Sequence, residues 1–117
     1  MRKIFVFGSN LAGIHEAGSA LAAKSSWGAT QGLGQGPMGR AYAIPTKDKY
    51  LNTLSLNRIE EYVNIFLEYA EDHPELQFRI VKIGCGLAGY HDEDIAPMFR
   101  GAPGNCVCHP DWEKYLT

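Results

Sequence analysis

The sequence predicts an α/β fold of three layers, in which helices cover both faces of a mostly parallel central sheet. Short apolar runs alternate with helical patterns along the 117 residues, and this alternation is typical of β-α-β units. Loops rich in glycine or in charged residues follow several of the apolar runs. With 45% hydrophobic and 21% charged residues the composition is that of a globular protein, and we expect residues 1–117 to form one compact domain.

The first half of the chain predicts two strands and one helix around a long glycine-rich loop. The apolar run Lys3–Phe7 predicts a buried strand that ends at Gly8, and a helix of small residues is expected at about residues 16–27. Residues 28–39 contain five glycines and one proline, a density at which we expect no regular element. A loop of this length is either functional or a mobile surface connection. The run RAYAIP, which Pro45 closes, predicts the next strand.

The second half predicts the clearest helix, at residues 56–72, with apolar side chains on one face and acidic side chains on the other. Either Ser55 or Asn57 can cap its first turn. The run LQFRIVKI predicts a third strand, DEDIAPMF a short helix with an acidic first turn, NCVCH a last strand and PDWEKYL a closing helical turn. Because helices join successive strands, we expect these strands to run parallel.

Composition and charge exclude several classes of function. The formal net charge of −2 offers no cationic excess for a phosphate backbone, so we expect no binding to duplex nucleic acid. No run approaches the ~18 apolar residues that a membrane span requires. Three cysteines, an odd count without a signal-peptide pattern, indicate a reducing compartment, and we expect a cytoplasmic protein.

The stretch GCGLAG, at residues 84–89, fits the pattern G-x-G-x-x-G between a predicted strand and a predicted helix. A dinucleotide fingerprint normally opens a domain, but only 28 residues follow Gly89, too few for a second nucleotide-binding half. A glycine-rich turn without a ligand is a second interpretation. A phosphate cradle is the third, because glycine lets backbone amides approach an anion. In a parallel sheet this loop should meet GSNLAG and PTKDK at one edge.

Three segments resemble macrodomains, the ADP-ribose-binding modules. VKIGCGLAGY resembles their phosphate-binding loop, and HEAGSALAAKSSWGA is similar to the segment after their first loop. YAIPTKDKY resembles the strand-and-lysine segment of the branch that hydrolyses ADP-ribose esters and deoxyguanosine adducts. In this order the segments span roughly residues 4–99. The whole chain also resembles small phage and bacterial macro-like proteins of undefined function.

The resemblance implies a macrodomain-like fold whose cleft, at the strand ends, takes an ADP-ribose-type small molecule or an ADP-ribosylated macromolecule. It implies a catalytic role for Lys47, whose amine would attack the aldehyde of an opened ribose. The ligand-binding residues that it implies are Gly8, Ser9, Asn10, Gly18, Gly84, Cys85, Gly86, Leu87, Ala88, Gly89 and Tyr90. Two departures are that no residue matches the adenine-binding acid and that Ala88 stands where the hydrolase branch has an aspartate. We expect no cofactor and no metal.

Several candidate residues keep a structural alternative. Lys47 also fits an exposed loop lysine, and Cys85 is either a thiol activated by a helix N-terminus or simply buried. The C-x-C-H cluster at residues 106–109 lacks the usual zinc spacing, and its cysteines share one strand face, which favours core packing. His15 and His91 are each expected to contact a ligand or to lie in solvent.

Four functional hypotheses follow. The leading one is a protein that binds ADP-ribose or a related nucleotide-diphosphate-ribose ligand. The second is an ADP-ribosyl glycohydrolase that uses Lys47 on a protein ester or a nucleobase adduct, with Asp48, Asp92 or Glu16 replacing the acid absent at Ala88. The third is a non-catalytic protein that sequesters a nucleotide immune signal. The fourth is a protein-interaction module with a vestigial pocket.

Overall fold

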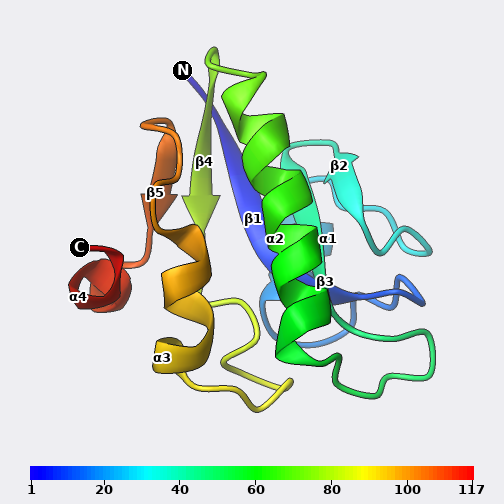
Figure 1. Cartoon of the computed structure of the whole chain (residues 1–117). Coiled ribbons are helices and arrows are strands. Elements are labelled where there is room, and N and C mark those ends of the chain that lie inside the picture. The colour runs from blue at the N-terminus through cyan, green and yellow to red at the C-terminus, as the bar shows by residue number, and fades with distance from the viewer.

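A computed structural model describes all 117 residues and shows a five-stranded sheet between two layers of helices (Figure 1). The strands, which lie in the order β2-β3-β1-β4-β5, are β1 (Arg2–Asn10), β2 (Gly36–Met38), β3 (Ala41–Lys47), β4 (Leu76–Ile80) and β5 (Cys106–Cys108). β1 runs parallel to β3 and β4, and β4 runs parallel to β5. Only β2 is antiparallel to its neighbour, β3. The mostly parallel sheet that the sequence predicts is confirmed.

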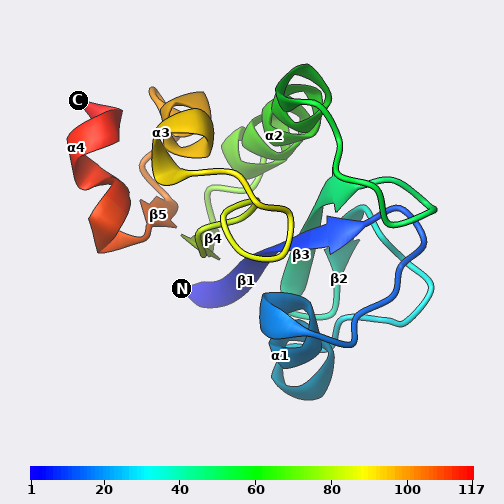
Figure 2. The same ribbon diagram turned by 90° about the horizontal axis from the view of Figure 1, so that it is seen from below.

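Helices cover both faces of this sheet, as predicted. The α-helices are α1 (Gly18–Ser26), α2 (Leu56–Glu71), α3 (Asp92–Ile95) and α4 (Glu113–Leu116), and two 3-10 turns, η1 (Ala96–Phe99) and η2 (Pro110–Trp112), extend the last two. Figure 2 shows α1 on one face and α2, α3 and α4 on the other. The hydroxyl of Ser55 accepts the N–H of Arg58 and caps α2, so Ser55 is the predicted cap that forms. None of the helices has the length and apolarity needed to cross a bilayer.

Alternate residues of the central strands face two separate apolar clusters. Val6 points to the larger cluster, below α2, whereas its neighbour Phe7 points to the smaller cluster, below α1. Apart from Phe7 and one methionine, the smaller cluster consists of alanines: Ala20, Ala23, Ala29, Ala41 and Ala43. Because alanine side chains are short, α1 lies close to the sheet. The first turn of α1 is thereby held beside the end of β1.

The segment Gly28–Gly39 corrects the prediction of no regular element, since β2 forms within it and pairs with the edge of β3. The segment packs backbone against backbone on the loop that follows β1. A Cβ at Gly34 would clash with the carbonyl oxygen of Asn10, and one at Gly13 would clash with the backbone of Gly32. Gly34 in this segment and Gly13 in the loop after β1 therefore allow the two stretches of backbone to pack closely.

Candidate functional site

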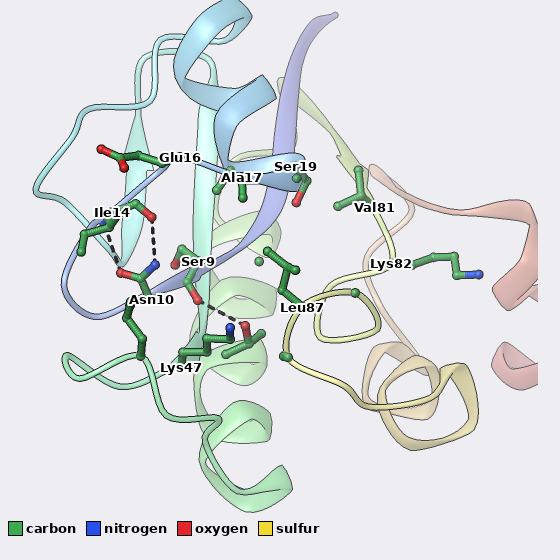
Figure 3. Close-up of a pocket in the computed structure, with 17 residues that line it drawn as sticks. Ser9, Asn10, Ile14, Glu16, Ala17, Ser19, Lys47, Val81, Lys82 and Leu87 are labelled. Carbon is green, nitrogen blue, oxygen red and sulfur yellow. Dashed lines mark hydrogen bonds between the residues drawn. The ribbon is translucent and has the colours of Figure 1, made fainter.

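A pocket of about 590 Å³ opens at the carboxyl edge of the parallel strands. Its walls come from the ends of β1 and β3, the first turn of α1 and the loop after β4 (Figure 3). Helical crossovers bring the carboxyl ends of parallel strands to one edge, which is why segments far apart in the sequence meet here.

The pocket brings together eight of the twelve residues that the sequence singled out. These eight are Gly8, Ser9, Asn10, Gly18, Lys47, Gly86, Leu87 and Ala88. The other four, Gly84, Cys85, Gly89 and Tyr90, belong to the same glycine loop but do not line the pocket. The phenol of Tyr90 instead donates a hydrogen bond to the carbonyl of Leu54, 2.8 Å away, and fixes the base of the loop.

The glycine loop presents three consecutive backbone amides to the pocket. The N–H groups of Gly86, Leu87 and Ala88 have no acceptor within the chain. The N–H of Gly89, a residue that the resemblance assigns to ligand binding, instead donates to the carbonyl of Gly86 at 3.0 Å. The loop is thus a tight turn whose three free donors lie at its tip, and such a group of amides is suited to an anion.

The first turn of α1 lines the same pocket with a second set of free amides. No side chain caps this helix, and no acidic residue lies in its first turn. The N–H groups of Gly18, Ser19 and Ala20 have no acceptor, and the N–H of Leu21 is the first to bond, to the carbonyl of Ala17. The positive end of the helix dipole therefore faces the pocket alongside the glycine loop.

Asn10 lines the pocket, but its side chain is largely occupied by its own loop. Its Nδ2 donates to the carbonyl of Ile14 at 2.9 Å, and its Oδ1 accepts the N–H of Ile14 at 3.0 Å. One amide hydrogen remains for a ligand. The hydroxyl of the buried Ser9 donates to the carbonyl of Gly34. The main role of both side chains is therefore to shape the wall of the pocket.

Lys47 lies at the end of β3, half-buried, with its side chain on the pocket wall. Its backbone is fixed on both sides, because its carbonyl accepts the N–H of Leu11 at 3.0 Å and it forms a bridge with Thr53. Its ammonium takes part in no ion pair, since the basic side chains that do are Arg58, Lys82 and His109.

The carboxylates that we considered as acid partners of Lys47 lie elsewhere. Glu16 lines the pocket, but Figure 3 shows its carboxylate pointing away from Lys47. Asp48 accepts two backbone N–H groups within its own turn. Asp92 forms an ion pair with Lys82. Position 88, on the pocket wall, is an alanine.

Cys85 is not the activated nucleophile that we considered. Burial, and then a hydrogen bond with Asp92, raise the pKa of the Cys85 thiol to about 12. The side chain therefore stays protonated at neutral pH, and a thiol is a poor nucleophile.

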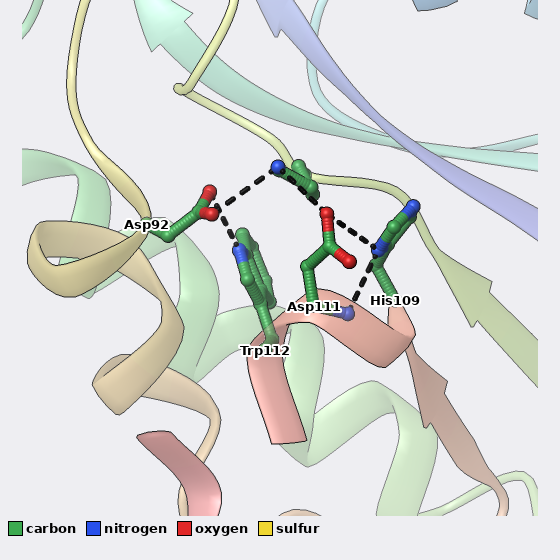
Figure 4. A network of polar contacts seen from close by, with 5 residues as sticks. Asp92, His109, Asp111 and Trp112 are labelled. Atoms are coloured by element: carbon green, nitrogen blue, oxygen red, sulfur yellow. Dashed lines mark hydrogen bonds and ion pairs between the residues drawn. The ribbon is translucent and has the colours of Figure 1, made fainter. Parts of the chain in front are cut away.

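A polar network on the far side of the glycine loop was not foreseen from the sequence (Figure 4). The Nζ of Lys82 lies 3.2 Å from Asp92 and 3.3 Å from Asp111. The indole N–H of Trp112 donates to Asp92 at 3.1 Å, and this bond, together with Lys82, lowers the pKa of Asp92. The network ties the C-terminal segment to the loop after β4. Its three parts, Lys82, Asp92 and residues 109–112, are too far apart in the sequence for a local pattern to show it.

His15 corrects a further expectation, because it neither lines the pocket nor lies in solvent. Its side chain is fully buried, packs edge-on against Phe7 and places Nε2 2.7 Å from the carbonyl of Leu33. It fastens the loop after β1 to the segment Gly28–Gly39. His91 precedes α3 and exchanges hydrogen bonds with Asp94.

The fold resembles a solved structure. The chain superposes on DarTG of Thermosipho africanus, solved in complex with ADP-ribose, with a TM-score of 0.64 over 95% of its length. The chain has a macrodomain-like fold. At 14% identity the likeness shows the fold alone, and it covers 39% of the DarTG chain. No protein-family model matches the sequence, and no curated protein matches it.

Proposed function

We propose that this macrodomain-like chain binds ADP-ribose, or a closely related nucleoside diphosphate ribose, in the pocket at the strand ends. The observation that carries the proposal is the pair of free amide sets, Gly18–Ala20 and Gly86–Ala88, on the wall of one pocket. A diphosphate offers several anionic oxygens, and backbone amides with a helix dipole stabilise these without a cationic side chain.

The size of the pocket and the likeness to DarTG support this choice of ligand. About 590 Å³ lies within the range of sites for small molecules and cofactors. The DarTG structure on which the chain superposes is a complex with ADP-ribose. These points favour a nucleotide-sized diphosphate over a lone phosphate.

Calorimetric titration of the full chain with ADP-ribose tests the proposal, with Ser19→Glu as the sensitive variant. Glutamate in the first turn of α1 suits the helix dipole, so we expect unchanged or slightly higher stability. Its carboxylate would also occupy the positive end of the pocket and repel the diphosphate, lowering affinity by about tenfold or more.

Ser25→Glu, near the other end of α1, adds the same charge outside the pocket and should leave the affinity unchanged. Absence of binding to the wild-type chain at millimolar ADP-ribose would refute the proposal. An equal effect of Ser19→Glu and Ser25→Glu on the affinity for ADP-ribose would also refute it.

Glycohydrolysis is a second candidate function, favoured by the position of Lys47 in the pocket without an ion-pair partner. Its amine would attack the anomeric carbon of the ribose and displace the ester carboxylate or the nucleobase as the leaving group. Opening of the ribose ring would then give a Schiff base, which water would hydrolyse to release ADP-ribose and restore the lysine. Turnover of an ADP-ribosylated peptide ester or nucleobase that Lys47→Ala abolishes, with a borohydride-trapped adduct on Lys47, would support catalysis. Equal turnover by the wild-type protein and by Lys47→Ala would remove Lys47 from the mechanism.

Sequestration of a nucleotide signal is the non-catalytic form of the same proposal. It predicts that a cyclic or otherwise modified ADP-ribose, bound by the protein and then released by heating, keeps its original mass. Release of a hydrolysis product with a different mass would indicate the enzyme instead.

A further inference from the structure

Leu51 has a left-handed backbone conformation, which is unfavourable for leucine. With φ at 67°, it is the only residue other than glycine with a positive φ. The turn is held by Asp48, whose Oδ1 accepts the N–H of Tyr50 at 2.8 Å and of Asn52 at 3.0 Å, while its carbonyl accepts the N–H of Leu51 at 3.0 Å. Glycine or asparagine occupies the left-handed region at far lower cost than leucine. The turn geometry alone therefore does not account for this side chain.

The side chain of Leu51 lines the pocket together with two other exposed apolar residues. Leu51 is 46% exposed, Ile14 40% and Leu87 73%, and all three lie on the pocket wall. Figure 3 shows Leu87 projecting from the glycine loop toward the middle of the pocket. These three side chains, which we call the apolar collar, come from three separate loops.

The turn of Leu51 is tied both to Lys47 and to the glycine loop. Thr53, which closes the turn, forms the bridge with Lys47. The hydroxyl of Thr53 also donates to the carbonyl of Ala88 at 3.1 Å. Leu51 is therefore held at the end of the pocket where Lys47 lies, next to the tip that carries the free amides.

We propose that the apolar collar is a subsite for an uncharged, planar group attached to the anomeric carbon of the ligand's terminal ribose. The inference rests on the proposed function, with the diphosphate at the free amides and the terminal ribose beside Lys47. Free ADP-ribose ends there in a hydroxyl, which gains nothing from contact with leucine and isoleucine. A planar organic group would bury the collar and so account for an exposed leucine at a strained position.

Titration with ADP-ribose and with NADH tests the inference, because NADH carries an uncharged dihydronicotinamide on that ribose carbon. We expect NADH to bind about tenfold more tightly than ADP-ribose, from the apolar area that the ring buries. In Leu51→Gly the ratio of the two affinities should fall to about two or less. The melting temperature of this variant should equal or exceed that of the wild type, because glycine relieves the left-handed strain.

Leu33→Asn is the matched control, since Leu33 is a loop leucine that is 52% exposed and lies outside the pocket. It should leave the affinity ratio unchanged. Binding of ADP-ribose with no preference for NADH would overturn the subsite and leave the proposed function standing, as would a ratio that survives in Leu51→Gly. A marked loss of stability in Leu51→Gly would assign the leucine to packing and also overturn the subsite. Absence of binding to both ligands would overturn both proposals.

Discussion

The segments Gly28–Gly39 and Gly84–Gly89 have similar compositions, but their most closely packed and most open glycines differ. In the first segment, a Cβ at Gly34 would meet the backbone of Asn10, and one at Gly39 would meet the backbone of Gly28 at the other end of the same segment. In the second, a Cβ at Gly86 or Gly89 would meet nothing within 4 Å. Gly34 and Gly39 thus serve close packing of backbone on backbone, whereas Gly86 leaves the backbone of its loop open to access.

Glycine content alone therefore does not locate a ligand site. The segment Gly28–Gly39 is hydrogen-bonded to β1 and the loop after it, through Ser9 with Gly34, His15 with Leu33 and the N–H of Gly32 with the carbonyl of Gly13. The segment Gly84–Gly89 keeps three N–H groups without acceptors at its tip. Unpaired backbone donors beside a pocket, rather than glycines, distinguish the candidate phosphate site.

The largest expected effect in this comparison is that of Gly34→Ala on stability. The added Cβ would overlap the carbonyl oxygen of Asn10, which is backbone and cannot turn aside. We expect the free energy of unfolding to fall by about 3 kcal/mol, as for severe overpacking. Urea denaturation measures it. Gly104→Ala, at an open position without a positive φ, is the control and should change stability by less than about 0.5 kcal/mol. Equal stability of the two variants would contradict the packing role.

A smaller effect, on binding rather than on stability, is expected for Gly86→Ala. Gly86 has no positive φ and open space around it, so the fold should tolerate a methyl group there. The methyl group would occupy the pocket at the free amides and weaken ADP-ribose binding by about tenfold. Calorimetry measures the affinity for ADP-ribose, and thermal melting measures the stability of the variant. A variant that loses stability but keeps its affinity would reverse the contrast between the two segments.

The smallest effect is expected at Cys85, which lies in the glycine loop but off the pocket wall. Because its pKa is raised to about 12, the reactive thiolate is scarce at neutral pH and increases as the pH rises toward that value. Alkylation of Cys85 by iodoacetamide, followed by mass spectrometry, should accelerate from pH 7 to pH 11 without a plateau near the ordinary thiol pKa. Rapid alkylation at pH 7 would show an activated cysteine and revive its catalytic role.

The sequence predicts the layers of the fold well because local signals specify them. Periodicity and the Ser55 cap locate α2, and short apolar runs locate β1, β3 and β4. It fails at β2, because three residues with glycine and proline carry no strand signal and pair only through contact with β3. Tertiary contact overrides local propensity there.

The candidate site is predicted in part, for a similar reason. The glycine loop, the end of β1 and Lys47 follow from the rule that parallel strands present their carboxyl ends at one edge. The hydrogen bonds and the backbone conformation of each group do not follow from this rule. That Asn10 is bonded to Ile14, that Gly89 donates within its own turn and that Leu51 is left-handed depend on three-dimensional contacts.

The most direct test of the central claim follows the backbone amides themselves during titration with ADP-ribose. In ¹H–¹⁵N NMR spectra of the full chain, we expect the largest shift changes at the amides of Gly86, Leu87 and Ala88 and of Gly18, Ser19 and Ala20. The amides of Gly32 and Gly39, in the packed segment, should move far less. Shifts confined to other surfaces, or no shifts at saturating ligand, would contradict the claim that these six free amides hold a diphosphate.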